Sequence, residues 1–231
     1  MIGAIIAALA YFGPGLLRSM QNNEGPFSVF SACTVEADER IGLDREEAQR
    51  AITAVALAAR GLDTPETSDI DDRVRDQLAQ GPSEDAGPSL SCRAKPESEL
   101  PVQEPTETGL TPRAAHVRES IIEVFGEVPM GGFAPGGVDE GHMPDSAHYD
   151  GRAIDIFFRP VTEEHRREGW ILAQWLVAHA QELHLEYVIF DDLVWSVHSA
   201  RGQWAAYDAP DPDNKILRHL DHVHVDVLAG E

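Results

Sequence analysis

Two short runs rich in histidine and aspartate constrain the fold of this chain more than any other feature. The first run, residues 146–155, holds His148 and Asp155 on either side of Gly151, and the second, residues 221–224, is Asp-His-Val-His. Imidazole and carboxylate groups are ligands that zinc prefers, and three protein ligands leave a fourth position for a water that the metal activates. The two runs therefore predict a zinc site of the hydrolase type, and the fold must bring them together.

The residues around the first run predict where its two metal-ligand candidates lie. Residues 153–158 are Ala-Ile-Asp-Ile-Phe-Phe, a β-branched and aromatic composition that is typical of a strand. The preceding pair Asp150-Gly151 is typical of a turn. We therefore expect His148 on a loop and Asp155 on a strand.

The second run leads into a segment with strict alternation. In residues 223–227, Val-His-Val-Asp-Val, successive side chains of a strand point to opposite faces. The valines are then expected to face the core, with His222, His224 and Asp226 on the other side. Both histidines can therefore face one metal ion.

The two runs together carry a family resemblance. The pattern S-x-H-x-x-G-x-A-x-D followed by H-x-H resembles the zinc peptidase superfamily of lysostaphin-type endopeptidases, D-alanyl-D-alanine carboxypeptidases and dipeptidases, and the hedgehog signalling domain. Residues 148–155 are especially similar to hedgehog. The resemblance covers the last half of the chain. It implies that His148, Asp155 and His224 bind zinc, and that His222 lies beside the metal without binding it.

The resemblance also names two candidates for the general base. Asp221 stands three residues before His224, where the D-alanyl-D-alanine peptidases place a glutamate. An aspartate side chain is one methylene shorter, which makes His222 an equal candidate. Asp221 and His222 are therefore both expected to be catalytic residues, and the sequence does not choose between them.

The C-terminal half resembles a second group, uncharacterised exported actinobacterial proteins. These proteins carry the run Gly-Gly-Phe-Ala-Pro-Gly-Gly, here residues 131–137, upstream of the metal motif. This resemblance implies an exported protein and supplies no substrate. The run itself is expected to be an irregular loop that shapes the rim of the site.

Composition limits the class of partner. With 231 residues, 42% of them hydrophobic, and four tryptophans, the chain can bury a substantial core. Its 18 Lys and Arg against 40 Asp and Glu give a net charge of −22. Nucleic acid is therefore excluded as an expected partner, because binding to phosphates needs cations that release counterions. A polyanionic cell wall is also repelled at long range, so a wall substrate must be recognised by local contacts.

The N-terminal sequence predicts export. Residues 1–20 contain an uncharged apolar run and are expected to be a signal or membrane-anchor segment. The run is shorter than the ~20 residues of a spanning helix and lacks a basic start, so a buried helix or a start further upstream are the alternatives. Cys33 and Cys92 are the only cysteines and predict one disulfide. The expected location is extracellular, or anchored to the membrane and facing outside.

We expect an α+β protein, in which a short helical region and a linker precede a small antiparallel sheet with flanking helices that carries the metal site. In the N-terminal region, residues 21–92, helices are predicted at 43–62, with Asp44 as N-cap, and at 68–80. Residues 93–111 are the linker, because they are rich in proline, glutamate, serine and threonine.

The zinc peptidase-like domain is expected to span residues 112–231. Its predicted elements are a helix that begins at Thr111-Pro112, a helix from Thr162 to about His184, a hairpin around Asp191-Asp192, and a last strand at 223–228.

Several other polar residues have both a functional and a structural interpretation. His142 and His219 flank the motifs and could orient the metal ligands, or lie there without a role. Arg152 could bind a substrate carboxylate, although an ion pair with an acidic neighbour is the simpler expectation. The same choice between substrate contact and packing applies to Tyr149, Trp195 and Tyr207.

Two functions from different classes follow. The first is a zinc-dependent hydrolase of peptide or amide bonds that acts on D-alanine-containing cell-wall peptides, with the peptidoglycan stem peptide as substrate. The second is a non-catalytic, zinc-stabilised extracellular binding module. A fourth protein ligand would indicate the second function, because structural zinc sites are closed, whereas an open position beside Asp221 and His222 would indicate the first.

Overall fold

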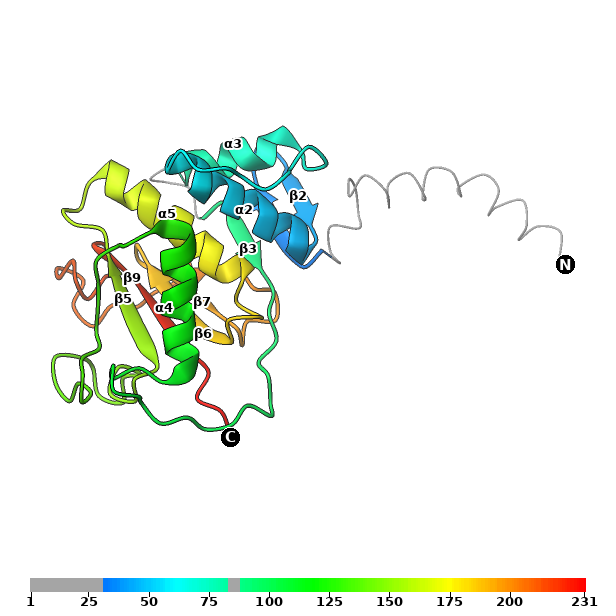
Figure 1. The fold of residues 1–231 in the computed structure, drawn as a ribbon. Helices are drawn as coiled ribbons and strands as arrows, with labels where there is room; N and C mark the ends of the chain where they lie inside the picture. Colours follow the sequence, from blue (N-terminus) through cyan, green and yellow to red (C-terminus); the bar gives the residue numbers. More distant parts are fainter. Residues whose placement is uncertain (1–30, 83–87) are drawn as a thin grey trace, which may run out of the picture.

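The structure is a computed structural model that describes residues 31–82 and 88–231. It confirms the α+β class, because two antiparallel sheets pack with four helices in the described part of the chain (Figure 1). The segment 1–20, expected to be a signal or membrane anchor, lies outside the described residues. Among the residues that are described, no helix is long and apolar enough to cross a membrane.

The larger sheet places the two metal-motif strands next to each other. Its six strands have the order β4-β5-β9-β6-β7-β8, so the last strand of the chain lies in the middle of the sheet. Each neighbouring pair is antiparallel. The strands are β4 (Met130–Gly131), β5 (Ala153–Phe157), β6 (Leu185–Phe190), β7 (Leu193–Ser196), β8 (Ala205–Ala206) and β9 (His222–Val227).

The register between β5 and β9 decides how the motifs meet. Asp155 stands directly opposite His224, and Phe157 stands opposite His222. Directly opposed residues of an antiparallel pair point to the same face, with Cβ atoms about 4.5–5.5 Å apart. The alternate residues on these strands, Ile154 and Val225 among them, are buried in the hydrophobic core. The predicted alternation is therefore confirmed.

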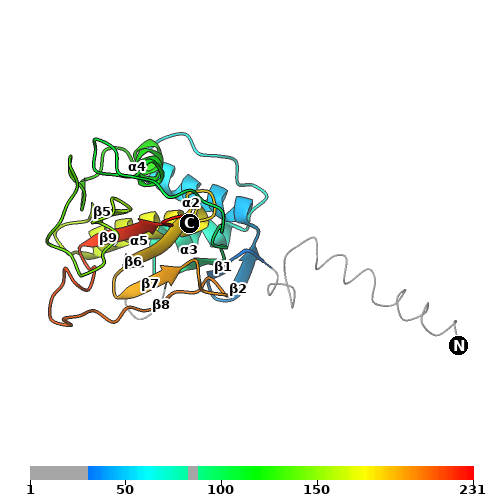
Figure 2. The same cartoon turned by 90° about the horizontal axis from the view of Figure 1, so that it is seen from below.

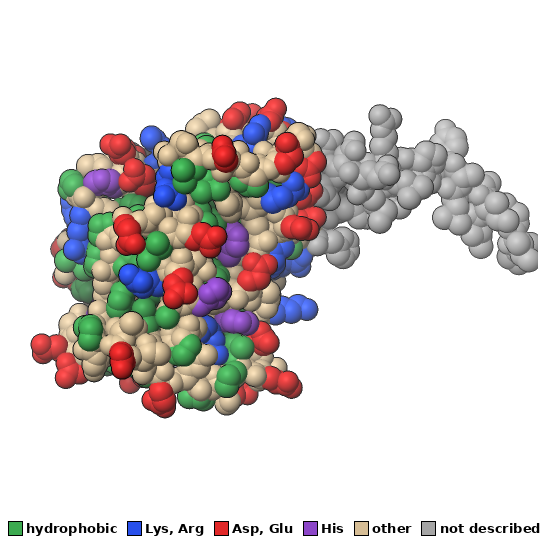
Figure 3. All heavy atoms as spheres, viewed as in Figure 1, with side chains coloured by type: hydrophobic (Ala, Val, Ile, Leu, Met, Phe, Trp, Pro, Cys, Tyr) green, Lys and Arg blue, Asp and Glu red, His purple; other side chains and the backbone are tan. Residues whose placement is uncertain are grey.

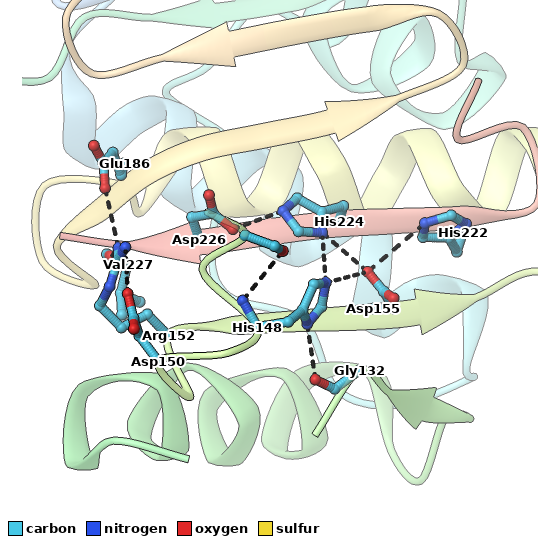
Figure 4. Close-up of polar contacts among 11 residues, drawn as sticks. Gly132, His148, Asp150, Arg152, Asp155, Glu186, His222, His224, Asp226 and Val227 are labelled. Carbon is cyan, nitrogen blue, oxygen red and sulfur yellow. Dashed lines mark hydrogen bonds and ion pairs between the residues drawn. The ribbon is translucent and has the colours of Figure 1, made fainter. Parts of the chain in front are cut away.

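Helix α5 (Glu163–Ala178) covers the core side of this sheet. In Figure 4 it passes behind the strands, while the motif side chains stand in front. Its N-cap Thr162 accepts a hydrogen bond from the backbone N–H of His165, as expected for a helix that begins here. The predicted end at His184 is wrong. The helix ends at Ala178 because the chain turns at residues 179–184, and His184 takes a positive φ of 52°.

The other elements of the C-terminal half follow the predictions closely. Helix α4 (Pro112–Phe125) begins at the N-cap Thr111, with proline in its first turn. The hairpin β6–β7 turns at Asp191 and Asp192, which both have positive φ. Such left-handed turn positions suit aspartate better than most residues.

The N-terminal region contains more than the predicted helices. Helix α2 (Arg45–Ala59) has the expected capping box of Asp44 and Glu47, and α3 (Asp72–Gln80) starts later than expected, at the N-cap Asp71. A second, three-stranded antiparallel sheet was not predicted, so the description of this region as helical was incomplete. Its strands, in the order β2-β1-β3, are β1 (Cys33–Glu36), β2 (Arg40–Leu43) and β3 (Leu90–Cys92).

The predicted disulfide is present. Cys33 and Cys92 stand opposite each other in the β1–β3 pair, and both are buried. The bond joins the first described strand to the strand that precedes the linker. A disulfide of this kind is typical of proteins in an oxidising environment.

Thiol titration of the unfolded, unreduced protein is expected to detect no free thiol, because both cysteines are in the bond. Replacing Cys33 and Cys92 together by alanine should lower the free energy of unfolding by about 4 kcal/mol, from the chain entropy of the loop that the bond closes. Equilibrium denaturation of the two proteins measures the difference. Two reactive thiols, or equal stabilities, would contradict a structural disulfide.

The predicted linker packs against the metal-motif loop. Residues 93–111, all described, contain no helix or strand, yet Leu110 is fully buried. The backbone N–H of Thr111 donates to the carbonyl of Gly151, at 2.9 Å. The carbonyl of Cys92, the residue just before the linker, accepts a hydrogen bond from the indole N–H of Trp195, at 2.9 Å. The core is one continuous cluster of buried residues, and the boundaries between the regions stay a prediction.

Candidate metal centre

The structure brings the three expected metal ligands together. The Nδ1 atom of His224 lies 3.0 Å from Oδ1 of Asp155 and 3.1 Å from Nε2 of His148. The third distance, from Nε2 of His148 to Oδ1 of Asp155, is 3.3 Å. All three residues are buried, at 8% exposure or less. Three candidate metal-ligand atoms therefore converge on one point (Figure 4).

These distances fit the size of a tetrahedral metal site. Zinc binds nitrogen and oxygen ligands at about 2.0–2.2 Å, so two ligand atoms of a tetrahedron lie about 3.3–3.5 Å apart. The observed separations of 3.0–3.3 Å come close to that spacing. Two imidazoles and one carboxylate also form a ligand set found in zinc enzymes. The residues therefore fit a divalent metal ion.

The local chain explains why each ligand points inward. Asp155 and His224 lie on the paired strands β5 and β9, which hold them side by side. His148 lies on the predicted loop, in a turn where the backbone N–H of Arg152 donates to the carbonyl of Ala147, at 2.9 Å. This turn folds the loop back over the strand, so that the imidazole reaches Asp155.

Both histidine rings are oriented by partners on their far side. Nδ1 of His148 lies 2.8 Å from the carbonyl oxygen of Gly132, and Nε2 of His224 lies 2.6 Å from Oδ1 of Asp226. Such partners fix the tautomer of metal-binding histidines and leave the other nitrogen for the metal. Gly132 has φ +78°, and a Cβ atom there would collide with the ring of His148. The glycine-rich run thus orients a ligand, in addition to shaping the rim.

The two candidate catalytic residues form a pair beside the ligands. Nδ1 of His222 lies 2.8 Å from Oδ1 of Asp221, and the other carboxylate oxygen accepts a hydrogen bond from Nε of Arg159, at 2.5 Å. Nε2 of His222 lies 3.7 Å from Oδ1 of Asp155. His222 therefore faces the cluster with one nitrogen, while Asp221 holds the ring from behind.

Charge and burial act in opposite directions on these groups. Burial would raise the pKa of Asp155, but hydrogen bonds from His148 and His224 hold it far below its usual value. Burial likewise opposes ionisation of Asp221, and hydrogen bonds with His222 and Arg159 lower its pKa overall. Both carboxylates are therefore ionised at neutral pH.

The environment of His224 links metal binding to pH. Burial would lower the pKa of this imidazole, but the carboxylates of Asp226 and Asp155 raise it above the ordinary histidine value. Without a metal the ring is therefore charged at neutral pH, with a proton on each nitrogen, and a metal ion must displace one of these protons. Metal affinity is consequently expected to fall as the pH is lowered.

Two further histidines lie in the cluster. The ring of His142 stacks on His148 with centroids 3.8 Å apart, and ligand atoms of His142, His148 and Asp155 lie within 4.8 Å of one another, close enough to hold a metal ion. His219 contacts His222, with ring centroids 4.7 Å apart. From the sequence, both were expected either to orient the ligands or to lie there without a role. Only one feature of the sequence indicated their place in the cluster, their position beside the motifs. Each lies on an irregular loop, so no helix or strand pattern predicts where its ring points.

Burial keeps His219 neutral. Its pKa is lowered to about 3, first by burial and then by the nearby rings of His224 and His222. Its Nδ1 atom is buried without a hydrogen-bond partner among the described residues. A neutral imidazole therefore lies next to the cluster.

A cavity of about 430 Å³ opens onto the cluster. Met143 and Ile216, which are 48% and 55% exposed, lie at its edge on two different loops. Acidic side chains are spread over the molecular face seen in Figure 3. The cavity is lined by metal-motif residues and their neighbours, including His142, His148, Asp155, Arg159, Tyr207, His219, His222, His224 and Asp226.

The remaining sequence candidates have mostly structural contacts. Arg152 donates to the carboxylate of Glu186, at 3.2 Å, and to the carbonyl of Val227, at 2.8 Å, so it forms the ion pair that was the simpler expectation. The hydroxyl of Tyr149 donates to the carbonyl of His142, at 2.8 Å. Trp195 is completely buried, whereas Tyr207 lines the cavity.

Comparison with known proteins gives one similarity. The family model described as VldE, C-terminal domain, matches residues 106–215, slightly less than half of the chain. This match includes His148 and Asp155 and ends before the second run at residues 221–224. No curated protein and no solved structure matches the chain.

Proposed function

We propose that this protein is a zinc-dependent hydrolase of peptide or amide bonds that acts outside the cell on D-alanine-containing cell-wall peptides. The observation that carries the proposal is the convergence of three ligand atoms from His148, Asp155 and His224 within 3.3 Å of one another, among the residues that line a cavity. A bound zinc ion would polarise the scissile carbonyl and acidify a water molecule.

His222 is the residue best placed to move a proton. Its Nδ1–H donates to ionised Asp221, so Nε2 carries the free lone pair on the side of the cluster. We assign to Nε2 the removal of a proton from the attacking water and its transfer to the leaving amine. Asp221 fixes the tautomer of the ring and stabilises its charged form, as the aspartate of a hydrolase triad does.

The substrate class rests on the resemblance to D-alanyl-D-alanine peptidases and on the site. A cavity of about 430 Å³ lies within the common range for small-ligand sites, about 300–1,000 Å³. It suits the end of a short peptide. The disulfide is in keeping with an extracellular location, and the net charge of −22 requires that a wall peptide be recognised by local contacts.

Activity measurements on the purified full chain test this proposal. Peptidoglycan fragments and synthetic stem peptides should be cleaved, with products identified by mass. A chelator should stop the reaction, and added zinc should restore it. If the substrates stay intact at every zinc concentration although the metal is shown to be bound, the proposed activity is refuted.

One observation favours the alternative of a zinc-stabilised binding module. His142 lies close enough to His148 and Asp155 to offer a further ligand atom. A fourth protein ligand would close the site, as in structural zinc centres. The stacking of the His142 and His148 rings, which places them face to face, favours packing over shared coordination.

Replacing His142 by alanine separates the two functions. In a catalytic site the variant should keep one metal ion per chain, with an affinity lowered at most about 10–100-fold, the usual effect of an orienting partner. In a closed structural site it should lose the metal. Metal analysis after dialysis, together with the melting temperature, distinguishes these results, and His116→Ala on the exposed side of α4 is the control.

A further inference from the structure

We infer that Arg159 binds the terminal carboxylate of the substrate, which makes this site one for peptide ends and not for the interior of a chain. The inference rests on the proposed function and adds the position of the bond that is cleaved. Arg159 is the one lysine or arginine among the described residues that line the cavity.

The guanidinium of Arg159 is held in place before any ligand arrives. Its Nε donates to Asp221, at 2.5 Å, and its central carbon lies 4.1 Å from the centre of the Phe157 ring. Stacking on an aromatic face and pairing with a carboxylate both restrict the side chain. Less conformational entropy is therefore lost when a ligand binds.

The same arrangement leaves donors for a ligand. Among the described residues, the hydrogen bond to Asp221 uses Nε alone, so both Nη groups remain for an incoming anion. The side chain is 49% exposed, which keeps these groups accessible from the cavity. Two parallel N–H donors match the two oxygens of a carboxylate.

The position of Arg159 relates the carboxylate to the reacting bond. Asp221 joins Arg159 to His222, and His222 faces the metal ligands. A carboxylate held by Arg159 therefore lies on the His222 side of the cluster, where the leaving amine needs a proton. In this arrangement the last residue of a bound peptide lies between Arg159 and the cluster, as in a carboxypeptidase or dipeptidase.

The acidity of the protein makes this single cation decisive. With a net charge of −22, the average field of the chain disfavours binding of a carboxylate, so a local positive charge must offset it in the cavity. A peptide bond in the interior of a chain has no terminal carboxylate beside it. The carboxylate thus gives the site a means to select chain ends.

A binding measurement tests the inference without relying on turnover. N-acetyl-D-alanyl-D-alanine and its C-terminal amide are titrated into the full chain, and calorimetry measures their binding. Mass spectrometry verifies that neither ligand is hydrolysed during the titration. The acid should bind more tightly than the amide. Arg159→Gln should weaken binding of the acid by about 10–100-fold, the usual value of a charge-assisted hydrogen bond, and leave the amide unchanged.

Matched variants give the controls. Arg73→Gln removes a similarly exposed arginine, 45% against 49%, that also pairs with an aspartate but lies on α3. It should change nothing. Arg159→Lys keeps the charge and loses the planar fork, so its affinity for the acid should be intermediate. If Arg159→Gln does not fold, Arg159→Lys and a salt titration of the parent protein supply the same comparison.

The outcomes separate the inference from the proposed activity. Equal affinity of the parent protein for acid and amide would overturn the inference, as would an equal loss of both in Arg159→Gln, which would restrict Arg159 to positioning Asp221. An acid that binds equally well to the parent and to Arg159→Gln would be held by the metal instead. Selective, Arg159-dependent binding of an acid that is never hydrolysed would refute the activity and retain the carboxylate site.

Discussion

Alanine in place of His148 is expected to remove the bound metal ion from the purified protein. The variant loses one of three converging ligand atoms, whose nearest partners lie 3.1 and 3.3 Å away. Loss of an outer partner alone costs about 10–100-fold in metal affinity, so loss of a ligand should cost more than about 100-fold. Metal content after dialysis and competition with a chelator of known affinity measure the change.

The comparison with neighbouring residues gives this result its meaning. Asp226→Asn removes a partner of the His224 ring and should weaken metal binding by about 10–100-fold, a smaller effect than that of His148→Ala. His222→Ala should retain the metal. If His148→Ala kept full metal while His222→Ala lost it, then His222 and His224 would be the pair of histidine ligands, and Asp155 would only orient them.

Local sequence patterns predicted the strands and turns that carry the site. The alternation of Val223, Val225 and Val227 determines which face of β9 is buried, and the turn chemistry at Gly151 places His148 on a loop. These features depend on residues within a few positions of each other. For that reason the faces of the strands were predictable without knowledge of their partners.

Long-range pairing was beyond such patterns. The register that sets Asp155 opposite His224 joins strands from distant parts of the chain, and nothing local encodes it. The ligand types and the family resemblance predicted only that the two runs meet at one metal ion, not which residues of the strands are paired. The sheet of β1, β2 and β3 was also missed. Its third strand, Leu90–Cys92, joins from far along the chain, and β1 and β2 form a hairpin with only four residues in each strand.

Loop geometry was also unpredictable. His142 reaches His148 because the irregular chain between Gly132 and His148 folds back on itself, and the hydroxyl of Tyr149 holds the His142 backbone there. No periodic pattern describes such a segment. The interaction of Arg159 with Asp221 likewise links the end of β5 to the start of β9, across residues that no motif connects.

Glutamine in place of His222 is expected to lower turnover by ~10²–10⁴-fold while the protein keeps its metal ion, because a proton-transfer group is lost without loss of a ligand. His222 is buried and contacts Asp221, so the melting temperature must be measured alongside activity. His198→Gln is the matched control, since His198 is 51% exposed and pairs with Glu186. It should leave turnover and metal content unchanged.

Asparagine in place of Asp221 tests how His222 is made a base. The amide cannot accept a proton or stabilise a charged imidazole as a carboxylate does, and its NH₂ group would favour the tautomer with the proton on Nε2. Turnover should therefore fall within the same ~10²–10⁴-fold range, and the double variant should lose little more than either single variant, because the two residues act as one unit. Losses that multiply in the double variant would instead indicate separate roles. If neither variant changes a measurable activity of the parent protein, both residues are excluded as the base. If the parent protein itself cleaves no D-alanine peptide although its metal is bound, the centre is structural and the domain is a zinc-stabilised binding module.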